Sequence, residues 1–166
     1  MSAKELVIVV NRANRVVGAR PRCEMRAKRL PHRATYVLVF NSAGELYVQK
    51  RTLTKDIYPG FCDPATGGVV LAGENYEQAA RRELAEELGI RDISLERHQD
   101  FYFEDPLCCV WGRIFSGIYD RPMIFQTEEV QSGEFLPVDE VLERSKTEPF
   151  APDSLEAVKL YLQARG

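Results

Sequence analysis

Three glutamates lie close together in the sequence, at a spacing that would place them on neighbouring positions of one helix face. Glu83 is followed by Glu86 three residues later and by Glu87 four residues later. Carboxylates arranged in this way repel one another and destabilise a bare helix by about a few tenths of a kcal/mol per pair. A hard divalent cation removes that repulsion, because Mg²⁺ prefers carboxylate oxygens and shares its coordination shell with water and substrate phosphates. The spacing therefore indicates either a solvated acidic face or a metal site.

A glycine-rich segment precedes these glutamates and favours the metal site. Gly67, Gly68 and Gly73 allow the backbone to approach a ligand closely. They stand next to the expected start of a helix, where phosphate groups are stabilised, so we expect Gly67 and Gly68 to contact substrate phosphate. Positive charge for the phosphates would come from three cationic side chains around the loop, which are otherwise solvated surface residues: Lys50, Arg51 and Lys55.

The elements expected around this segment are those of a mixed α/β domain. Apolar residues at positions 80, 84 and 88 predict a helix over 75–88, which Gly89 ends. β-type runs predict strands at 6–10, 15–19, 34–40, 45–51, 93–97, 100–104, 109–119 and 133–137. Further helices are expected at 21–29, 138–144 and 153–164, the last with Asp153 and Glu156 as a capping box. The order lacks a regular strand–helix–strand repeat, which favours a mixed sheet covered by helices.

Length and composition narrow the class of protein. The chain has 166 residues, of which 45% are hydrophobic and 28% charged, as in one globular domain. No apolar run approaches the roughly 20 residues of a membrane span, and we see no signal-peptide pattern. We therefore expect a cytoplasmic protein without a membrane partner, whose four cysteines are reduced.

Charge is unevenly distributed along the chain. Residues 1–50 contain ten Lys and Arg against three Asp and Glu, whereas residues 51–166 contain twelve against twenty-two. The basic cluster from Arg20 to Arg33 has neither interleaved aromatic residues nor a nucleic-acid motif. A nucleic-acid partner is therefore disfavoured against an ordinary solvated helix face, and the role of the basic segment stays open.

The segment from Gly68 to Ile90 resembles the signature of the Nudix hydrolase family. That signature is a glycine, five residues, a glutamate, seven residues, Arg-Glu, an aliphatic residue, any residue, Glu-Glu, any residue, a glycine and an aliphatic residue. Every fixed position is filled here: Gly68, Glu74, Arg82, Glu83, Leu84, Glu86, Glu87, Gly89 and Ile90. The resemblance implies a Nudix-type α/β/α sandwich with a mixed β-sheet over residues 32–166. Residues 1–31 would form an N-terminal β-hairpin and short helix as an appendage.

The resemblance also implies a reaction and its cofactor. The protein would be a metal-dependent hydrolase that cleaves a diphosphate linkage in a nucleoside-diphosphate-X-type or other organic diphosphate. Glu83, Glu86 and Glu87 would bind Mg²⁺, with Mn²⁺ as the alternative ion. Glu74 and Arg82 would pair and brace the loop. The expected partner is a small-molecule diphosphate, and a homodimer is compatible with the sequence.

A carboxylate must accept a proton from the attacking water in such a reaction. Glu86 and Glu87 are candidates within the cluster. In many family members a catalytic glutamate comes from a loop before a late strand, and the resemblance places Glu129, and after it Glu128, in that role. The alternative is that both are exposed loop acids.

Two alternatives to a hydrolase stay open. The segment around His32 and Tyr58-Pro59-Gly60 is similar to the isopentenyl-diphosphate isomerase branch of the same fold, and the likeness extends over most of the chain to bacterial hydrolases of that isomerase-like subgroup. The catalytic cysteine and metal-binding histidine of that branch would fall at Gly67 and Val69, and Cys62 lies five residues too early. The second alternative is a non-catalytic nucleotide-binding module, which would not need the full set of glutamates.

Overall fold

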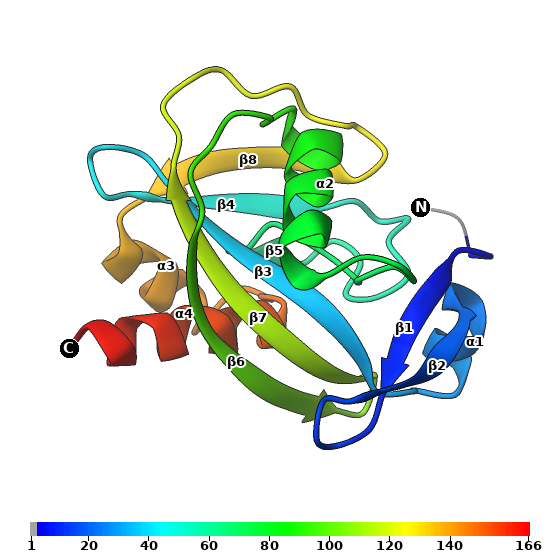
Figure 1. Cartoon of the computed structure of the whole chain (residues 1–166). Helices are drawn as coiled ribbons and strands as arrows, with labels where there is room; N and C mark the ends of the chain where they lie inside the picture. Colours follow the sequence, from blue (N-terminus) through cyan, green and yellow to red (C-terminus); the bar gives the residue numbers. More distant parts are fainter. Residues whose placement is uncertain (1–2) are drawn as a thin grey trace.

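The β-branched and aromatic runs of the chain form a mixed sheet, which is the middle layer of the structure (Figure 1). The computed structural model describes residues 3–166. Within these residues the sheet has eight strands: β1 (Leu6–Val10), β2 (Val16–Pro21), β3 (His32–Phe40), β4 (Leu46–Arg51), β5 (Cys62–Asp63), β6 (Glu96–Asp105), β7 (Cys108–Ile118) and β8 (Val130–Leu136). β3 and β7 pair in parallel from His32 with Val110 to Phe40 with Ile118, and the other strand pairs are antiparallel.

Helices cover both faces of the sheet, which confirms the expected α/β/α sandwich (Figure 1). On one face, α2 (Tyr76–Leu88) packs Leu84 and Leu88 against β3 and β7. On the other, α4 (Pro152–Arg165) packs Val158 and Tyr161 against the sheet, next to α3 (Val138–Arg144). None of the helices that the structure describes is long and apolar enough to cross a membrane.

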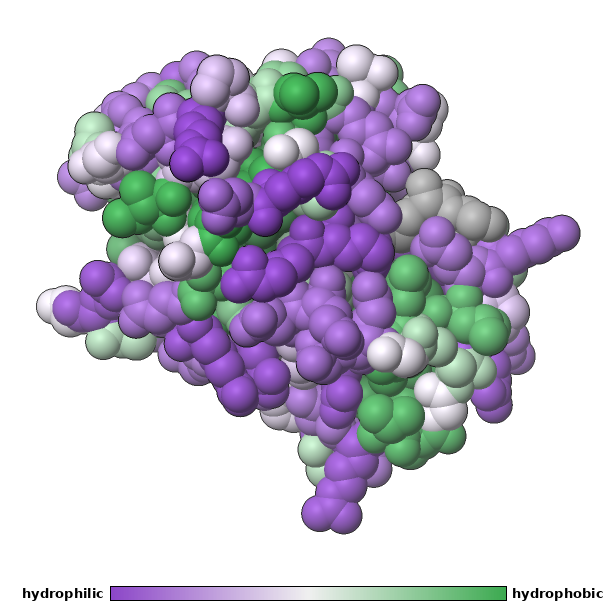
Figure 2. Space-filling model, turned by 45° about the horizontal axis from the view of Figure 1, so that its top comes forward, coloured by the Kyte–Doolittle hydropathy of each residue, from purple (hydrophilic) through white to green (hydrophobic). Residues whose placement is uncertain are grey.

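The N-terminal hairpin extends this same sheet. β1 pairs with β3 through Val9 and His32, and its Val7 packs with Met25 of α1 (Arg22–Ala27) and with Val69. Figure 2 shows a mostly hydrophilic surface, with a hydrophobic patch at the right over this hairpin, where Leu6, Val16 and Val17 are exposed. The hairpin and α1 therefore lie directly beside the glycine-rich loop.

Two local predictions are corrected by the structure. The two strands expected at 93–97 and 100–104 form one strand, β6, whose pairing with β7 shifts in register between Arg97 and Asp100. The predicted capping box of α4 is wrong, because the helix begins after Ala151 with a proline in its first turn. Asp153 instead accepts a hydrogen bond from Tyr36 Oη at 2.7 Å, so a contact with the sheet replaces the local cap.

Candidate active site

The glycine-rich loop reaches the site by running along β3. Thr35 N donates a hydrogen bond to Gly68 O at 2.9 Å, and Val37 N donates to Thr66 O at 2.7 Å. Gly67 has φ +153°, and a Cβ added to it would lie 2.2 Å from Thr35 O. Only glycine allows two backbones to approach so closely, so Gly67 sets the position of the loop.

Helix α2 presents its glutamates from a well-capped start. The Asn75 side chain accepts from Gln78 N at 2.8 Å, and the Gln78 side chain accepts from Asn75 N at 2.9 Å, a reciprocal capping box. Gly89 ends the helix in the left-handed conformation at φ +67°. Glu83 and Glu87, one turn apart, face inward and are only 1% and 2% exposed. Their carboxylates are held inside the protein.

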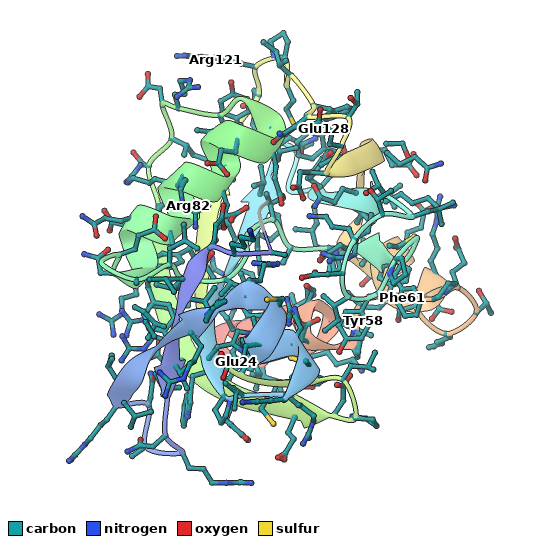
Figure 3. The ribbon with its side chains drawn as sticks, turned by 90° about the vertical axis from the view of Figure 1, so that its right-hand side faces the viewer. Glu24, Tyr58, Phe61, Arg82, Arg121 and Glu128 are labelled. Atoms are coloured by element: carbon teal, nitrogen blue, oxygen red, sulfur yellow. The ribbon has the colours of Figure 1, made fainter. Side chains whose placement is uncertain are left out.

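Arg82 links α2 to the loop that precedes it. Its guanidinium donates to both carboxylate oxygens of Glu74, at 2.7 and 3.0 Å, and to Val69 O at 3.2 Å. The same side chain, labelled in Figure 3, donates to Glu83 at 2.8 Å and to Glu86 at 3.3 Å. Glu86 lies about 100° around the helix from Glu87, so its side chain points outward and is 50% exposed.

A lysine joins α2 to the loop before β8. Lys55 Nζ lies 3.6 Å from Glu87 Oε1 and forms an ion pair with Glu129. The loop is tied to α2 because Gln126 N donates to Glu87 O at 2.9 Å, and Figure 3 shows Glu128 near the carboxyl end of that helix. The Glu128 side chain is exposed and accepts from Gln126. Of the two loop acids, the structure brings Glu129 towards the α2 carboxylates.

The oxygen atoms around Glu87 fit a hard cation. Burial, and after it the charge of Glu83, raises the pKa of Glu87 to about 8, and burial also raises the pKa of Glu83. Within the described residues, Gln49 Oε1 is buried without a hydrogen-bond partner, while Gln49 Nε2 lies 3.5 Å from Glu87 Oε2. Lys55 supplies one positive charge to this set. In the same part of the chain, no three His, Cys, Asp or Glu side chains are grouped as a metal cage.

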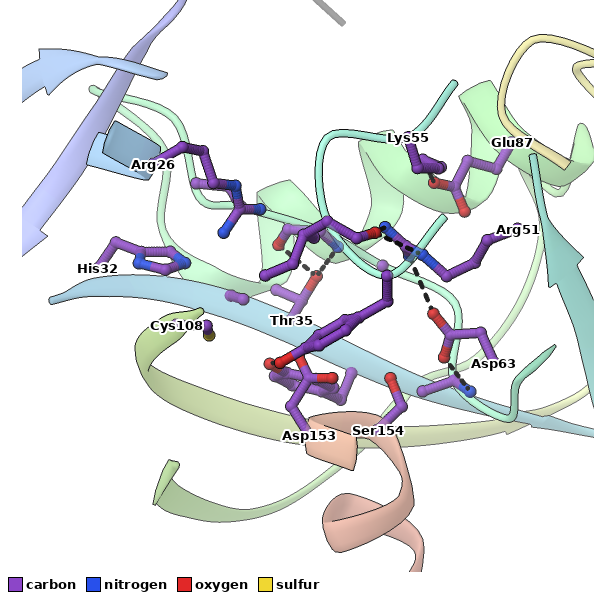
Figure 4. Close-up of a pocket in the computed structure, with 18 of the residues that line it drawn as sticks. Arg26, His32, Thr35, Arg51, Lys55, Asp63, Glu87, Cys108, Asp153 and Ser154 are labelled. Atoms are coloured by element: carbon purple, nitrogen blue, oxygen red, sulfur yellow. Dashed lines mark hydrogen bonds and ion pairs between the residues drawn. The ribbon is translucent and has the colours of Figure 1, made fainter. Parts of the chain in front are cut away.

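A charged cavity opens beside Glu87 (Figure 4). Arg26 and His32 lie at one end of it, whereas Lys55, Arg51 and Glu87 lie at the other. Gly67 and Gly68 also line this cavity, so the loop lies where the sequence predicts its contact with a substrate. The other polar residues of the lining include Arg22, Thr35, Tyr36, Asp63, Asp153 and Ser154.

The structure separates the two cations predicted for phosphate binding on β4. Lys50 is exposed and lines a different cavity, together with Cys62. Arg51 lines the cavity beside Glu87, but its guanidinium donates to Ile57 O at 2.8 and 3.1 Å and to Asp63 at 3.1 Å. Arg51 therefore lies in the wall of the cavity beside Glu87 with its charge paired to Asp63, whereas Lys50 lies outside this cavity.

Several polar residues of the site were not predicted as such. Gln49 and Asp63 are 2% and 5% exposed, and a polar side chain that directly follows Leu46, Tyr47 and Val48 in the strand was a signal for Gln49. Arg22 and Arg26 were recognised only as members of a basic cluster. Their approach to the loop depends on the packing of α1, which residue spacing does not show.

Comparisons with known proteins agree with the fold. A sequence model of the NUDIX domain matches residues 30–159. An uncharacterized Nudix hydrolase of Pseudomonas aeruginosa is 47% identical over 98% of this chain and 96% of its own length. The uncharacterized Nudix hydrolase YfcD of Escherichia coli is 42% identical over 98% of this chain and 89% of its own. The crystal structure of DR0079 from Deinococcus radiodurans superposes with a TM-score of 0.81 at 29% identity, covering 93% of this chain and 98% of that one.

Proposed function

The chain belongs to the Nudix hydrolase family, and on this premise we propose that it hydrolyses a diphosphate linkage in a small organic substrate with a divalent cation bound at Glu83 and Glu87. Mg²⁺ is the ion proposed, with Mn²⁺ as the alternative. The observation that supports this most is the buried pair of α2 carboxylates, both with raised pKa values, of which Glu87 lines a cavity that glycines and cations also line. A nucleoside diphosphate linked to a further group, or another organic diphosphate, is the substrate type.

Each side chain has a defined part in such a reaction. The cation, when bound, would neutralise diphosphate oxygens and lower the pKa of a water molecule. Arg82 keeps Glu83 facing inward through their 2.8 Å hydrogen bond. Glu86 has a lesser part, because its side chain is half-exposed and paired with Arg82. The loop at Gly67 and Gly68 would lie against the substrate phosphates.

Glu129 is the proposed proton acceptor. Burial raises the pKa of Glu129, but charge and hydrogen bonding, those of the Lys55 ammonium first, lower it overall, so the carboxylate is ionised at neutral pH. As water attacks phosphorus and the anhydride P–O bond breaks, the water proton would pass to Glu129. Lys55 would then be free to neutralise a substrate phosphate. The products are two phosphate-bearing molecules.

A substrate screen with two matched variants tests this proposal. Nucleoside, sugar, dinucleotide and isoprenoid diphosphates are incubated with and without Mg²⁺, and phosphate or monophosphate release is measured. We expect hydrolysis only with the metal, and a loss of about a hundredfold or more in Glu87→Gln. Glu77→Gln removes an exposed carboxylate from the same helix and should retain activity, since Glu77 pairs with Arg81 at the surface.

Three outcomes would contradict the proposal. Wild-type turnover in Glu87→Gln would refute the metal site, because the buried carboxylate would then be dispensable. A moved double bond in isopentenyl diphosphate, with both phosphates retained, would identify an isomerase. Tight binding of a diphosphate without cleavage of any compound in the panel would identify a binding module.

A further inference from the structure

Two arginines of the N-terminal basic cluster lie in the wall of the catalytic cavity. Arg22 and Arg26 project from one side of α1, and the guanidinium of Arg26 reaches into the cavity in Figure 4. The proposed hydrolysis uses the opposite end, around Glu87 and Lys55. The end formed by α1 therefore has no part in the chemistry described so far.

The positive charge at this end is only partly compensated. Arg22 Nε and Arg26 Nε both donate to the same oxygen of Asp56, at 2.8 and 3.3 Å, so one carboxylate serves two guanidinium groups. Although burial raises the pKa of Asp56, Arg26 and Arg22 together hold it well below its ordinary value, so Asp56 contributes a full negative charge. One net positive charge remains.

Arg22 also has an unused donor. The residue is 9% exposed, and within the described part of the chain its Nη1 is buried without a hydrogen-bond partner. A buried guanidinium nitrogen is costly to leave unpaired, and most such groups in proteins have a partner. An anion in the cavity would supply the acceptor.

The acids that line the cavity are engaged elsewhere. Asp63 is paired with Arg51, Glu87 lies beside Lys55, and Asp153 accepts a hydrogen bond from Tyr36. At the α1 end, burial, and after it the charge of Arg26, lowers the pKa of His32 to about 3, so this imidazole is neutral. The α1 end therefore keeps the positive charge that Asp56 leaves uncompensated.

We propose that Arg22 and Arg26 form an anion subsite that binds the terminal phosphate of an organic diphosphate. This rests on the proposed hydrolysis at the other end of the cavity and specifies its substrate class. The guanidinium group of arginine binds phosphate oxygens in a bidentate geometry. The subsite is walled by buried side chains, among them His32 at 2% and Cys108 at 3% exposed. A phosphate that ends the molecule fits such a closed end, whereas a phosphate that carries a second organic group needs an exit.

Binding of imidodiphosphate without metal tests the subsite directly. This diphosphate analogue is not hydrolysed and is titrated into the protein by calorimetry. The variant Arg22→Gln/Arg26→Gln should bind it about ten- to a hundredfold more weakly than the wild type. The control Arg20→Gln/Lys28→Gln removes the same charge from exposed positions outside this cavity and should change the Kd less than about twofold.

Further variants keep the test decisive if the double variant does not fold. Arg26→Gln alone leaves the more buried Arg22 in place and should still weaken binding. Arg22→Lys retains the charge but loses the planar guanidinium group, so its affinity for imidodiphosphate should lie between those of the wild type and Arg22→Gln. The proposal is overturned if the wild type does not bind imidodiphosphate, if these variants bind like the wild type, or if the control loses as much affinity as they do.

Hydrolysis distinguishes this inference from the proposed function. With Mg²⁺, we expect a higher kcat/KM for ADP, which ends in a phosphate, than for ADP-ribose, whose diphosphate is internal. The Arg22→Gln/Arg26→Gln variant should lose this preference. Faster cleavage of ADP-ribose, unaffected by the variant, would refute the terminal-phosphate subsite and leave the hydrolase intact. Binding of imidodiphosphate without metal-dependent cleavage of any diphosphate would refute the hydrolase and leave the subsite.

Discussion

Replacing Gly67 with alanine should destabilise the protein far more than an ordinary glycine-to-alanine change. The added Cβ would lie 2.2 Å from Thr35 O, well under the 3.0 Å below which such contacts are essentially never seen. The atom in the way belongs to the backbone of β3, which cannot turn aside as a side chain can. The loop must therefore move away from the strand.

The cost follows from the bonds that this movement breaks. The hydrogen bonds Thr35 N to Gly68 O and Val37 N to Thr66 O join the loop to β3. Each contributes about 0.5 to 1.5 kcal/mol net, and more if a buried group is left unpaired. Forcing alanine into the φ of Gly67 adds about 1 to 3 kcal/mol. We expect a loss of about 2 to 6 kcal/mol in the free energy of unfolding.

Urea unfolding, followed by the fluorescence of Trp111, measures this loss. The matched control is Gly44→Ala, because Gly44 also has a positive φ, +79°, but nothing lies within 4 Å of its added Cβ. That control should cost only about 1 to 2 kcal/mol of backbone strain. If Gly67→Ala loses no more than Gly44→Ala, the close approach of loop and strand is not what holds the loop in place.

Three further predictions concern titration and reactivity. Burial and the charge of Glu83 raise the pKa of Glu87 to about 8, so Mg²⁺ must displace a proton from this carboxyl group to bind. The Kd for Mg²⁺, measured by calorimetry, should therefore fall by up to about tenfold per pH unit between pH 6 and 8. Equal Kd values at pH 6.5 and 8.5 would contradict this. Burial lowers the pKa of His32 to about 3, so only the unfolded chain gains this proton as pH falls below about 6.5. The free energy of unfolding should then drop by up to about 1.4 kcal/mol for each pH unit below this value. In urea titrations, His32→Gln should remove this contribution to the pH dependence. Burial raises the pKa of the Cys108 thiol to about 12, so Cys108→Ser should leave the fast phase of labelling by a thiol reagent unchanged, whereas Cys23→Ser should remove it.

Local structure was predictable because its determinants are adjacent in sequence. The periodic apolar residues and Gly89 predicted helix 75–88, and the structure has α2 at Tyr76–Leu88 with Gly89 in the left-handed conformation. Most predicted strands differ from the observed ones by one to three residues. The capping box of α4 failed because Tyr36, far away in sequence, takes the Asp153 carboxylate. A tertiary contact overrode a local rule.

Sequence spacing was most informative about the candidate site along α2 and the glycine-rich loop before it. Helical spacing predicted that Glu83, Glu86 and Glu87 lie on neighbouring positions of one face. In the structure Glu83 and Glu87 are buried whereas Glu86 is half-exposed, because only part of that face packs against the sheet. The approach of Lys55 to Glu87 joins positions 32 residues apart through an irregular loop, and no periodicity describes it. The same holds for Arg22 and Arg26, whose place depends on how the N-terminal hairpin extends the sheet.

The position of Lys55 would make binding of the proposed cation and binding of the proposed diphosphate interdependent. Without metal, the Lys55 ammonium pairs with Glu129 and lies 3.6 Å from Glu87 Oε1. A cation bound there would release the lysine, and a phosphate group would give the released lysine a new partner. Each ligand would therefore reduce the free-energy cost of binding the other, and this coupling would be equal in both directions. We expect the metal to bind weakly alone and tightly once a diphosphate is present.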